Sequence, residues 1–175
     1  NHGVVIGGGS LGEAFERFET LEFAAKTVIK ASLLGPVRYL DDREAERWRP
    51  PPGGAVLQRG GPVSSLEKEL RRQLGEFVRR AYQQRLMIST QGAFSARVDG
   101  DTFLITPHRV DRSTLDLDDL VLVRGDAAEA GKVPSSAAAN HRGVYDAHPE
   151  VTAVVNAYPV NATAFSVTAA TLDTR

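Results

Sequence analysis

The chain has 175 residues, of which 42% are hydrophobic and 25% are charged, and its formal net charge is −1. This length allows a sizeable hydrophobic core, whereas the near-neutral charge provides no global field for nucleic acid or anionic lipid, and no apolar run approaches the roughly 20 residues that span a bilayer. Because no cysteine occurs, disulfides, thiolate metal sites and cysteine nucleophiles are excluded, and we expect a cytoplasmic protein with neither nucleic acid nor membrane as partner.

The first predicted element is a long amphipathic helix. A short apolar run at residues 4–6 ends in three glycines, and Ser10 and Glu13 then have the spacing of a capping box at a helix start. Apolar residues recur at three- and four-residue steps until Leu34, where a Gly-Pro pair stops the pattern. These positions are Leu11, Phe15, Phe18, Leu21, Ala25, Val28 and Ile29. A stripe with this period predicts that one face of the helix is buried.

The next stretch, residues 36–63, shows no sustained period and contains three consecutive prolines and two Gly-Gly pairs, which predicts a linker. A second helix is expected to start at the capping box of Ser64 and Glu67 and to end near Leu86. Its predicted apolar side consists of Leu66, Leu70, Leu74, Phe77 and Ala81. The arginine pairs of this helix, at 71–72 and 79–80, are interpreted as a solvated face.

The second half of the chain predicts a sheet with interspersed helices. Residues 88–98 and 102–106 alternate between apolar and small or polar side chains, and the Asp-Gly pair between them favours a hairpin turn. Three elements follow: a strand at residues 120–123, a short helix at 136–147 and a buried strand at 151–155 that ends at Asn156. This mixture predicts an α/β fold.

Five short motifs follow one another in this second half. They are Ser89-Thr90-Gln91-Gly92-Ala93-Phe94-Ser95, Leu104-Ile105-Thr106-Pro107, Asp118-Asp119-Leu120-Val121, Pro134-Ser135-Ser136 and Ala153-Val154-Val155-Asn156-Ala157-Tyr158-Pro159. Their order and spacing resemble the N-terminal part of the class II aldolase/adducin family, and residues 1–34, which begin Asn-His-Gly, resemble the C-terminal part of the same fold. The resemblance implies αβα layers around a mostly antiparallel mixed sheet. It also implies that residues 1–35 end a first domain, residues 36–63 form a linker and residues 64–175 begin a second, degenerate domain.

The resemblance implies a metal site that this chain does not complete. Family enzymes hold a divalent metal, usually zinc, through a His-x-His-Pro segment and a third histidine in Asn-His-Gly, with an acid/base carboxylate just after Pro-Ser-Ser. Asn156 and Tyr158 stand at the two His-x-His positions, and Ala137 stands at the carboxylate position. Because an amide and a phenol are poor ligands for zinc, we expect no catalytic residue and no bound zinc in this chain. His2 could ligate a metal only with partners outside the chain.

The resemblance also implies a phosphate site. The positions that match the family pattern are Thr90, Gly92, Ser135 and Ser136. Arg109 would add a bidentate donor, so a small phosphorylated sugar is the expected ligand. The alternative for Ser136 is a simple N-cap, which is the commonest role of serine at a helix start. His141 and His148 are interpreted as surface or capping residues rather than ligands.

Two functions are compatible with these patterns. In the first, the chain is part of a tandem protein whose family activity is that of a metal-dependent aldehyde-lyase, for retro-aldol cleavage or epimerisation of sugar phosphates, and its second domain is inactive. In the second, the protein is a non-catalytic, adducin-like assembly or ligand-sensing module. Family enzymes commonly assemble with active sites at subunit boundaries, which implies a homo-oligomer or packing between tandem domains. Whether residues 1–34 pack on the second half or on another copy stays open.

Overall fold

A computed structural model describes residues 3–47, 55–58 and 62–172. Its contacts separate the chain into unit 1, which comprises Asn1–Arg49 and Tyr158–Arg175, and unit 2, which comprises Pro50–Ala157. No helix in the described part of the chain is long and apolar enough to cross a membrane. The sequence predicts a different division, at residues 35 and 63, between the end of one family domain, a linker and the start of a second domain. The division by spatial contacts does not test it, so it stays a prediction.

Helix α1 of unit 1 spans Leu11–Leu34, as the sequence predicts. The Ser10 Oγ accepts a hydrogen bond from the Glu13 N–H (3.1 Å), which confirms the predicted cap. The predicted burial of the apolar stripe is wrong, because Phe15 is 52% exposed and α1 buries only Thr27 and Ala31. Within unit 1 this 24-residue helix packs on the seven-residue helix α5 (Val160–Ser166), which is too short to cover the whole stripe.

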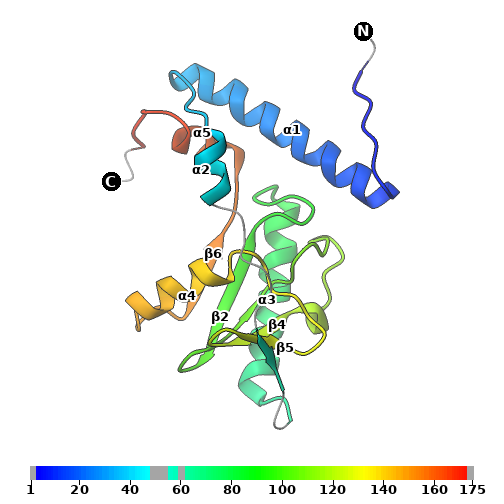
Figure 1. The fold of residues 1–175 in the computed structure, drawn as a ribbon, viewed down its shortest axis with the longest axis vertical. Helices are drawn as coiled ribbons and strands as arrows, with labels where there is room; N and C mark the ends of the chain where they lie inside the picture. Colours follow the sequence, from blue (N-terminus) through cyan, green and yellow to red (C-terminus); the bar gives the residue numbers. More distant parts are fainter. Residues whose placement is uncertain (1–2, 48–54, 59–61, 173–175) are drawn as a thin grey trace. The chain divides into compact units, whose positions relative to one another are not determined.

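Two short helices complete unit 1. Helix α2 (Asp42–Arg47) falls inside the predicted linker, and Asp41 and Glu44 exchange backbone-to-carboxylate hydrogen bonds at its start. Helix α5 lies beside α1 (Figure 1), where the Lys30 Nζ donates to the Asn161 Oδ1 at 2.7 Å. Both helices were missed by sequence reasoning because six or seven residues are too few to display a helical period.

Unit 2 is built on a six-stranded mixed sheet. Its strands are β1 (Ala55–Leu57), β2 (Ala93–Asp99), β3 (Thr102–Ile105), β4 (Val121–Arg124), β5 (Ala127–Glu129) and β6 (Ala153–Asn156). Their spatial order is β1-β5-β4-β3-β2-β6, with β1 parallel to β5 and every other pair antiparallel. The predicted hairpin and the predicted mostly antiparallel mixed sheet are therefore confirmed.

Two aspects of the strands differ from the predictions. Strands β1 and β5 were not predicted, because three residues each are too few to establish an alternating pattern. The predicted burial of β6 is wrong, because β6 is an edge strand and Val155 is 60% exposed. A continuous apolar run is typical of a strand covered on both faces, but the sequence of β6 does not reveal its position in the sheet.

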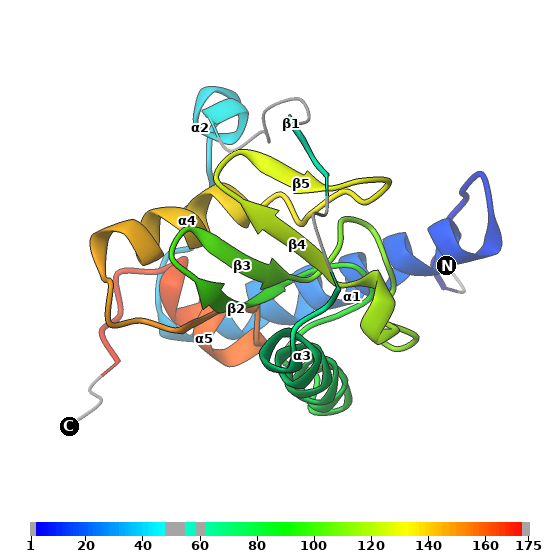
Figure 2. The same ribbon diagram turned by 90° about the horizontal axis from the view of Figure 1, so that it is seen from below.

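Helices cover both faces of the sheet, and this confirms the predicted αβα layers. In Figure 2, strands β2 to β5 lie side by side between α3 (Ser65–Gln83) and α4 (Ala138–Ala147). The core on the α3 side contains Leu74, Val78, Ala81, Met87, Phe94, Ala96, Leu104, Leu115, Leu120 and Leu122. The core on the α4 side contains Ala93, Phe103, Ile105, Val121, Val123 and Tyr145. Successive residues of β2 and β3 alternate between the two cores, as the pleat of a strand requires.

The buried face of α3 differs in part from the predicted one. Leu74 and Ala81 are buried as expected, whereas Leu66 and Phe77 are 53% and 50% exposed. Arg71, interpreted from the sequence as solvated, is 7% exposed. Its guanidinium donates to the Glu67 carboxylate and to backbone carbonyls around η1 (Leu117–Asp119), so the buried face of α3 includes an ion pair as well as apolar side chains.

Candidate functional site

Three turns meet at one end of the sheet of unit 2. Residues 89–92 precede β2, residues 106–112 follow β3 and residues 134–137 precede α4, and we call these segments the turn cluster. Because β2 and β3 are antiparallel, the start of one and the end of the other lie at the same edge. The Ser135 N–H donates to the Thr106 carbonyl (3.0 Å), which joins the third turn to the second.

The centre of the turn cluster is Arg112, a residue that sequence reasoning missed. It is 1% exposed. Its Nη2 donates to the carbonyls of Thr90 (3.1 Å), Gly92 (2.9 Å) and Pro107 (3.1 Å), and its Nη1 donates to the Val110 carbonyl (2.8 Å). Burial lowers the pKa of Arg112 to about 10, while the nearby Asp111 carboxylate acts in the opposite direction. The guanidinium therefore ties two turns together and stays positively charged at neutral pH.

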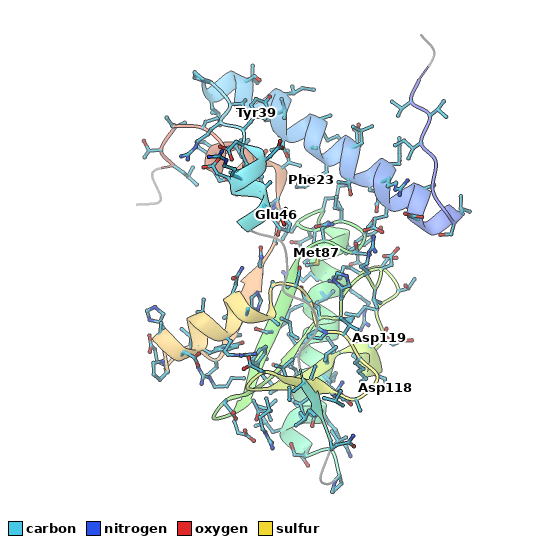
Figure 3. The ribbon with its side chains drawn as sticks, viewed as in Figure 1. Phe23, Tyr39, Glu46, Met87, Asp118 and Asp119 are labelled. Carbon is cyan, nitrogen blue, oxygen red and sulfur yellow. The ribbon has the colours of Figure 1, made fainter. Side chains whose placement is uncertain are left out.

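The predicted anion-binding residues are only partly brought together. Arg112 connects Thr90 to Gly92, and Ser135 is buried in the same cluster. Gly92 has a φ of 88°, and a Cβ at this position would lie 2.6 Å from the Met87 methyl, so the turn needs glycine. Figure 3 labels Met87, which is 1% exposed.

The other two predicted residues, Arg109 and Ser136, lie at the surface of the turn cluster. Arg109 has a φ of 53°, a conformation that residues other than glycine seldom adopt. The N-cap alternative for Ser136 is wrong: Ala137 occupies the N-cap position of α4, and the hydroxyl that accepts a backbone bond there is that of Ser135, from the Ala137 N–H (3.3 Å). The Ser136 hydroxyl is thus not committed to capping α4, and the five-residue anion site itself stays a prediction.

The residues at the metal and acid/base positions that the resemblance implies do not fit that chemistry. Asn156 pairs with Ala93 at the end of β6, Ala137 is half-buried at the start of α4, and Tyr158 belongs to unit 1. His2 lies outside the described residues. Within the described ranges no three His, Cys, Asp or Glu side chains gather as a metal site would require. An amide, a methyl group and a phenol offer neither imidazole donors nor a carboxylate, so no reaction step is assigned to a metal here.

A buried polar cluster beneath α4 was also missed. The Ser95 Oγ lies 2.7 Å from the His141 Nδ1 and 2.7 Å from the Tyr145 hydroxyl. The surface interpretation of His141 is wrong, because its side chain is 2% exposed, whereas His148 is at the C-cap of α4 as predicted. The spacing of His141 and Tyr145, four residues apart on a helix, was the available sequence signal for this cluster.

Two bacterial relatives are named for their action on sugar phosphates. A 5-methylthioribulose-1-phosphate/5-deoxyribulose-1-phosphate aldolase of Escherichia coli O45:K1 is 40% identical over 79 residues, which are 45% of this chain and 37% of the relative. A methylthioribulose-1-phosphate dehydratase of Yersinia enterocolitica is 34% identical over 80 residues, 45% of this chain and 38% of the relative. The matched part of the chain thus spans less than half the length of either relative.

The fold and the family are established by two further comparisons. The structure of YgbL from Klebsiella pneumoniae superposes with a TM-score of 0.50 at 22% identity, over 53% of this chain and 45% of that protein, which shows a shared fold. Residues 72–174, more than half of the chain, match the family described as Class II Aldolase and Adducin N-terminal domain. The protein is therefore a member of the class II aldolase and adducin family.

Proposed function

We propose that unit 2 binds the phosphate group of a small sugar phosphate at the turn cluster, within a protein whose activity is of the lyase type. The observation that carries this proposal is the buried Arg112, whose hydrogen bonds to Thr90, Gly92 and Pro107 place a positive charge behind the turns. The predicted ligand groups are those of Thr90, Gly92, Arg109, Ser135 and Ser136. The names of the relatives, which refer to methylthioribulose 1-phosphate, support this class of ligand.

The proposal assigns binding, but not bond cleavage, to this half-site. The positions that would hold two metal ligands and the acid/base group carry Asn156, Tyr158 and Ala137. We propose that cleavage or epimerisation belongs to an upstream domain of a tandem protein, of which residues 1–35 would be the end. Residues 64–175 would then be its inactive companion, joined by residues 36–63. A cytoplasmic location and a homo-oligomer, or packing between the tandem domains, complete this proposal.

A second candidate is a non-catalytic, adducin-like assembly or ligand-sensing module. The replacement of all three chemical positions favours it, because a sensor needs the phosphate contacts but not the metal. The two candidates differ in zinc content. Stoichiometric zinc and retro-aldol cleavage in the full-length protein favour the tandem enzyme, whereas phosphate binding without either favours the sensor.

The anion site is tested by titrating inorganic phosphate and dihydroxyacetone phosphate while the melting temperature is recorded. Binding to the folded state raises the melting temperature by mass action, so we expect a concentration-dependent rise for the wild type. Arg109→Ala should abolish the rise, because it removes an exposed guanidinium with no structural bond of its own among the described residues. Arg43→Ala, an exposed arginine of α2, serves as the control and should preserve the rise. A flat wild-type curve at millimolar ligand contradicts the proposed site.

A further inference from the structure

Two buried arginines in unit 2 have opposite electrostatic environments. Arg71 is 7% exposed, and its guanidinium forms ion pairs with Glu67 (2.8 Å) and Glu129 (3.2 Å). Arg112 is 1% exposed, and all its hydrogen-bond acceptors are backbone carbonyls. In the part of the chain that the structure describes, no carboxylate lies within ion-pair distance of Arg112. The Asp111 side chain instead accepts bonds from Ser113.

A buried charge without a counter-ion lowers the stability of a fold unless another interaction compensates for it. Carbonyl dipoles compensate for part of the charge of Arg112, but its Nε is buried with no hydrogen-bond partner among the described residues. The Asp111 carboxylate offsets a further part of the charge from beyond ion-pair distance. The rest of the positive charge of this side chain remains uncancelled at the turn cluster. An anion bound on the turns would supply the missing negative charge.

The same hydrogen bonds fix the shape of the turns. The carbonyls of Thr90 and Gly92 both point at the Nη2, and the Arg112 N–H donates to the Ser89 carbonyl (2.9 Å). Ser89 has a φ of 36° and Gly92 has a φ of 88°, so this turn holds two residues in the left-handed region. A planar guanidinium offers several donors in one fixed arrangement, which a lysine ammonium cannot reproduce.

We infer that Arg112 is the positioning residue and the buried counter-charge of a phosphate-monoester site on the turn cluster. The inference rests on the proposed function and names the residue through which that site acts. Because its side chain is 1% exposed, Arg112 acts through the turns rather than by touching the ligand. The exposed Arg109 would make the direct contact, while Arg112 holds the Thr90 and Gly92 turn in a binding conformation.

The test compares Arg112→Lys with Arg71→Lys in the 175-residue chain, each titrated with inorganic phosphate by calorimetry. Both variants keep a buried positive charge and lose the fork geometry. We expect the Kd of Arg112→Lys for phosphate to rise at least about tenfold, because bonds from a charged donor to the turn are lost. The Kd of Arg71→Lys should stay within about twofold of the wild type, since Arg71 has no hydrogen bond to the turn cluster among the described residues. A merely structural role would lower the melting temperature of both variants and leave both Kd values unchanged, which overturns the inference.

A second measurement covers the case in which Arg112→Lys does not fold. Saturating phosphate should slow hydrogen exchange at the backbone amides of residues 89–92 and 108–112 of the wild type, and it should leave the amides of α3 unchanged. Unchanged exchange in the turns of a wild type that does bind phosphate overturns the inference alone. A wild type that binds no phosphate overturns the proposed anion site and this inference together.

Discussion

At the scale of single residues, unit 2 buries a group of three polar side chains that bond to one another. Beneath α4 the Ser95 hydroxyl bonds to both His141 and Tyr145, whereas the His141 Nε2 is buried without a hydrogen-bond partner among the described residues. The Arg97 guanidinium lies 4.7 Å from the centre of the Tyr145 ring. Burial raises the pKa of the Tyr145 hydroxyl, so the phenol stays protonated over the physiological range. The hydroxyl groups can therefore donate within the cluster while the neutral His141 accepts.

Burial of His141 predicts a loss of stability in mild acid. Burial lowers the pKa of this imidazole from its ordinary value of 6.5 to about 4. Above pH ~6.5 the imidazole is neutral in both states, whereas between there and pH ~4 the unfolded chain binds more protons. The free energy of unfolding should therefore fall as the pH drops through this window, by at most about 3 kcal/mol from this group.

The measurement is urea unfolding near pH 7 and near pH 5. His141→Gln should be less stable than the wild type near neutrality, because it disturbs the bond to Ser95, but its stability should fall less between the two pH values. The exposed His148 at the end of α4 provides the control, and His148→Gln should retain the wild-type pH dependence. Equal losses in wild type and His141→Gln would refute this assignment.

At the scale of elements, α3 shows why periodicity predicted the helix but only half of its buried face. The apolar residues Leu66 and Phe77 fit a helical stripe as well as Leu74 does, yet about half of the surface of each is exposed to solvent. The buried positions between them carry Glu67 and Arg71, whose ion pair no apolar pattern can reveal. Charged residues are seldom buried unless paired, and the partner Glu129 is distant in sequence.

Helix α3 provides a matched pair of truncations. Leu74 is 7% exposed in the core on the α3 side, and Phe77 is 50% exposed on the same helix. Leu74→Ala should lower the free energy of unfolding by about 2–5 kcal/mol, because it removes buried methyl groups and leaves a cavity. Phe77→Ala should cost less than about 1 kcal/mol despite the larger side chain removed. Chemical denaturation checks both, and a larger loss for Phe77→Ala would contradict the described face of α3.

In the turn cluster, the sequence predicts the features that depend on neighbouring residues and does not predict those that depend on tertiary contacts. The order of the short motifs identified the turns around Thr90, Pro107 and Ser135, because each motif consists of neighbouring residues that are typical of a turn or a strand end. Arg112 was not identified, since a guanidinium that bonds to backbone carbonyls leaves no pattern in the side chains around it. Buried turn carbonyls are generally expected to accept hydrogen bonds. Which residue donates those bonds is determined by the tertiary structure.

At the scale of the whole molecule, the two units differ in how much core they contain. Both hydrophobic clusters lie within unit 2, on the two faces of its sheet. Among the described residues of unit 1, the buried apolar side chains are those of Ala31 and Ala164. Small methyl groups of this kind remove little apolar area from water, so we expect unit 1 to contribute little to stability.

This asymmetry predicts that a fragment comprising residues 50–157 folds without unit 1. It contains every strand of the sheet and both helices that cover it, and about 100 residues are enough for an independent domain. Its urea unfolding should be a single cooperative transition, with an m-value lower than that of the full chain in proportion to the surface it exposes. Leu74→Ala within the fragment should destabilise it by as much as in the full chain, because Leu74 belongs to the hydrophobic core on the α3 side of unit 2. A fragment with no cooperative transition would contradict this prediction, because it would show that the sheet depends on residues of unit 1.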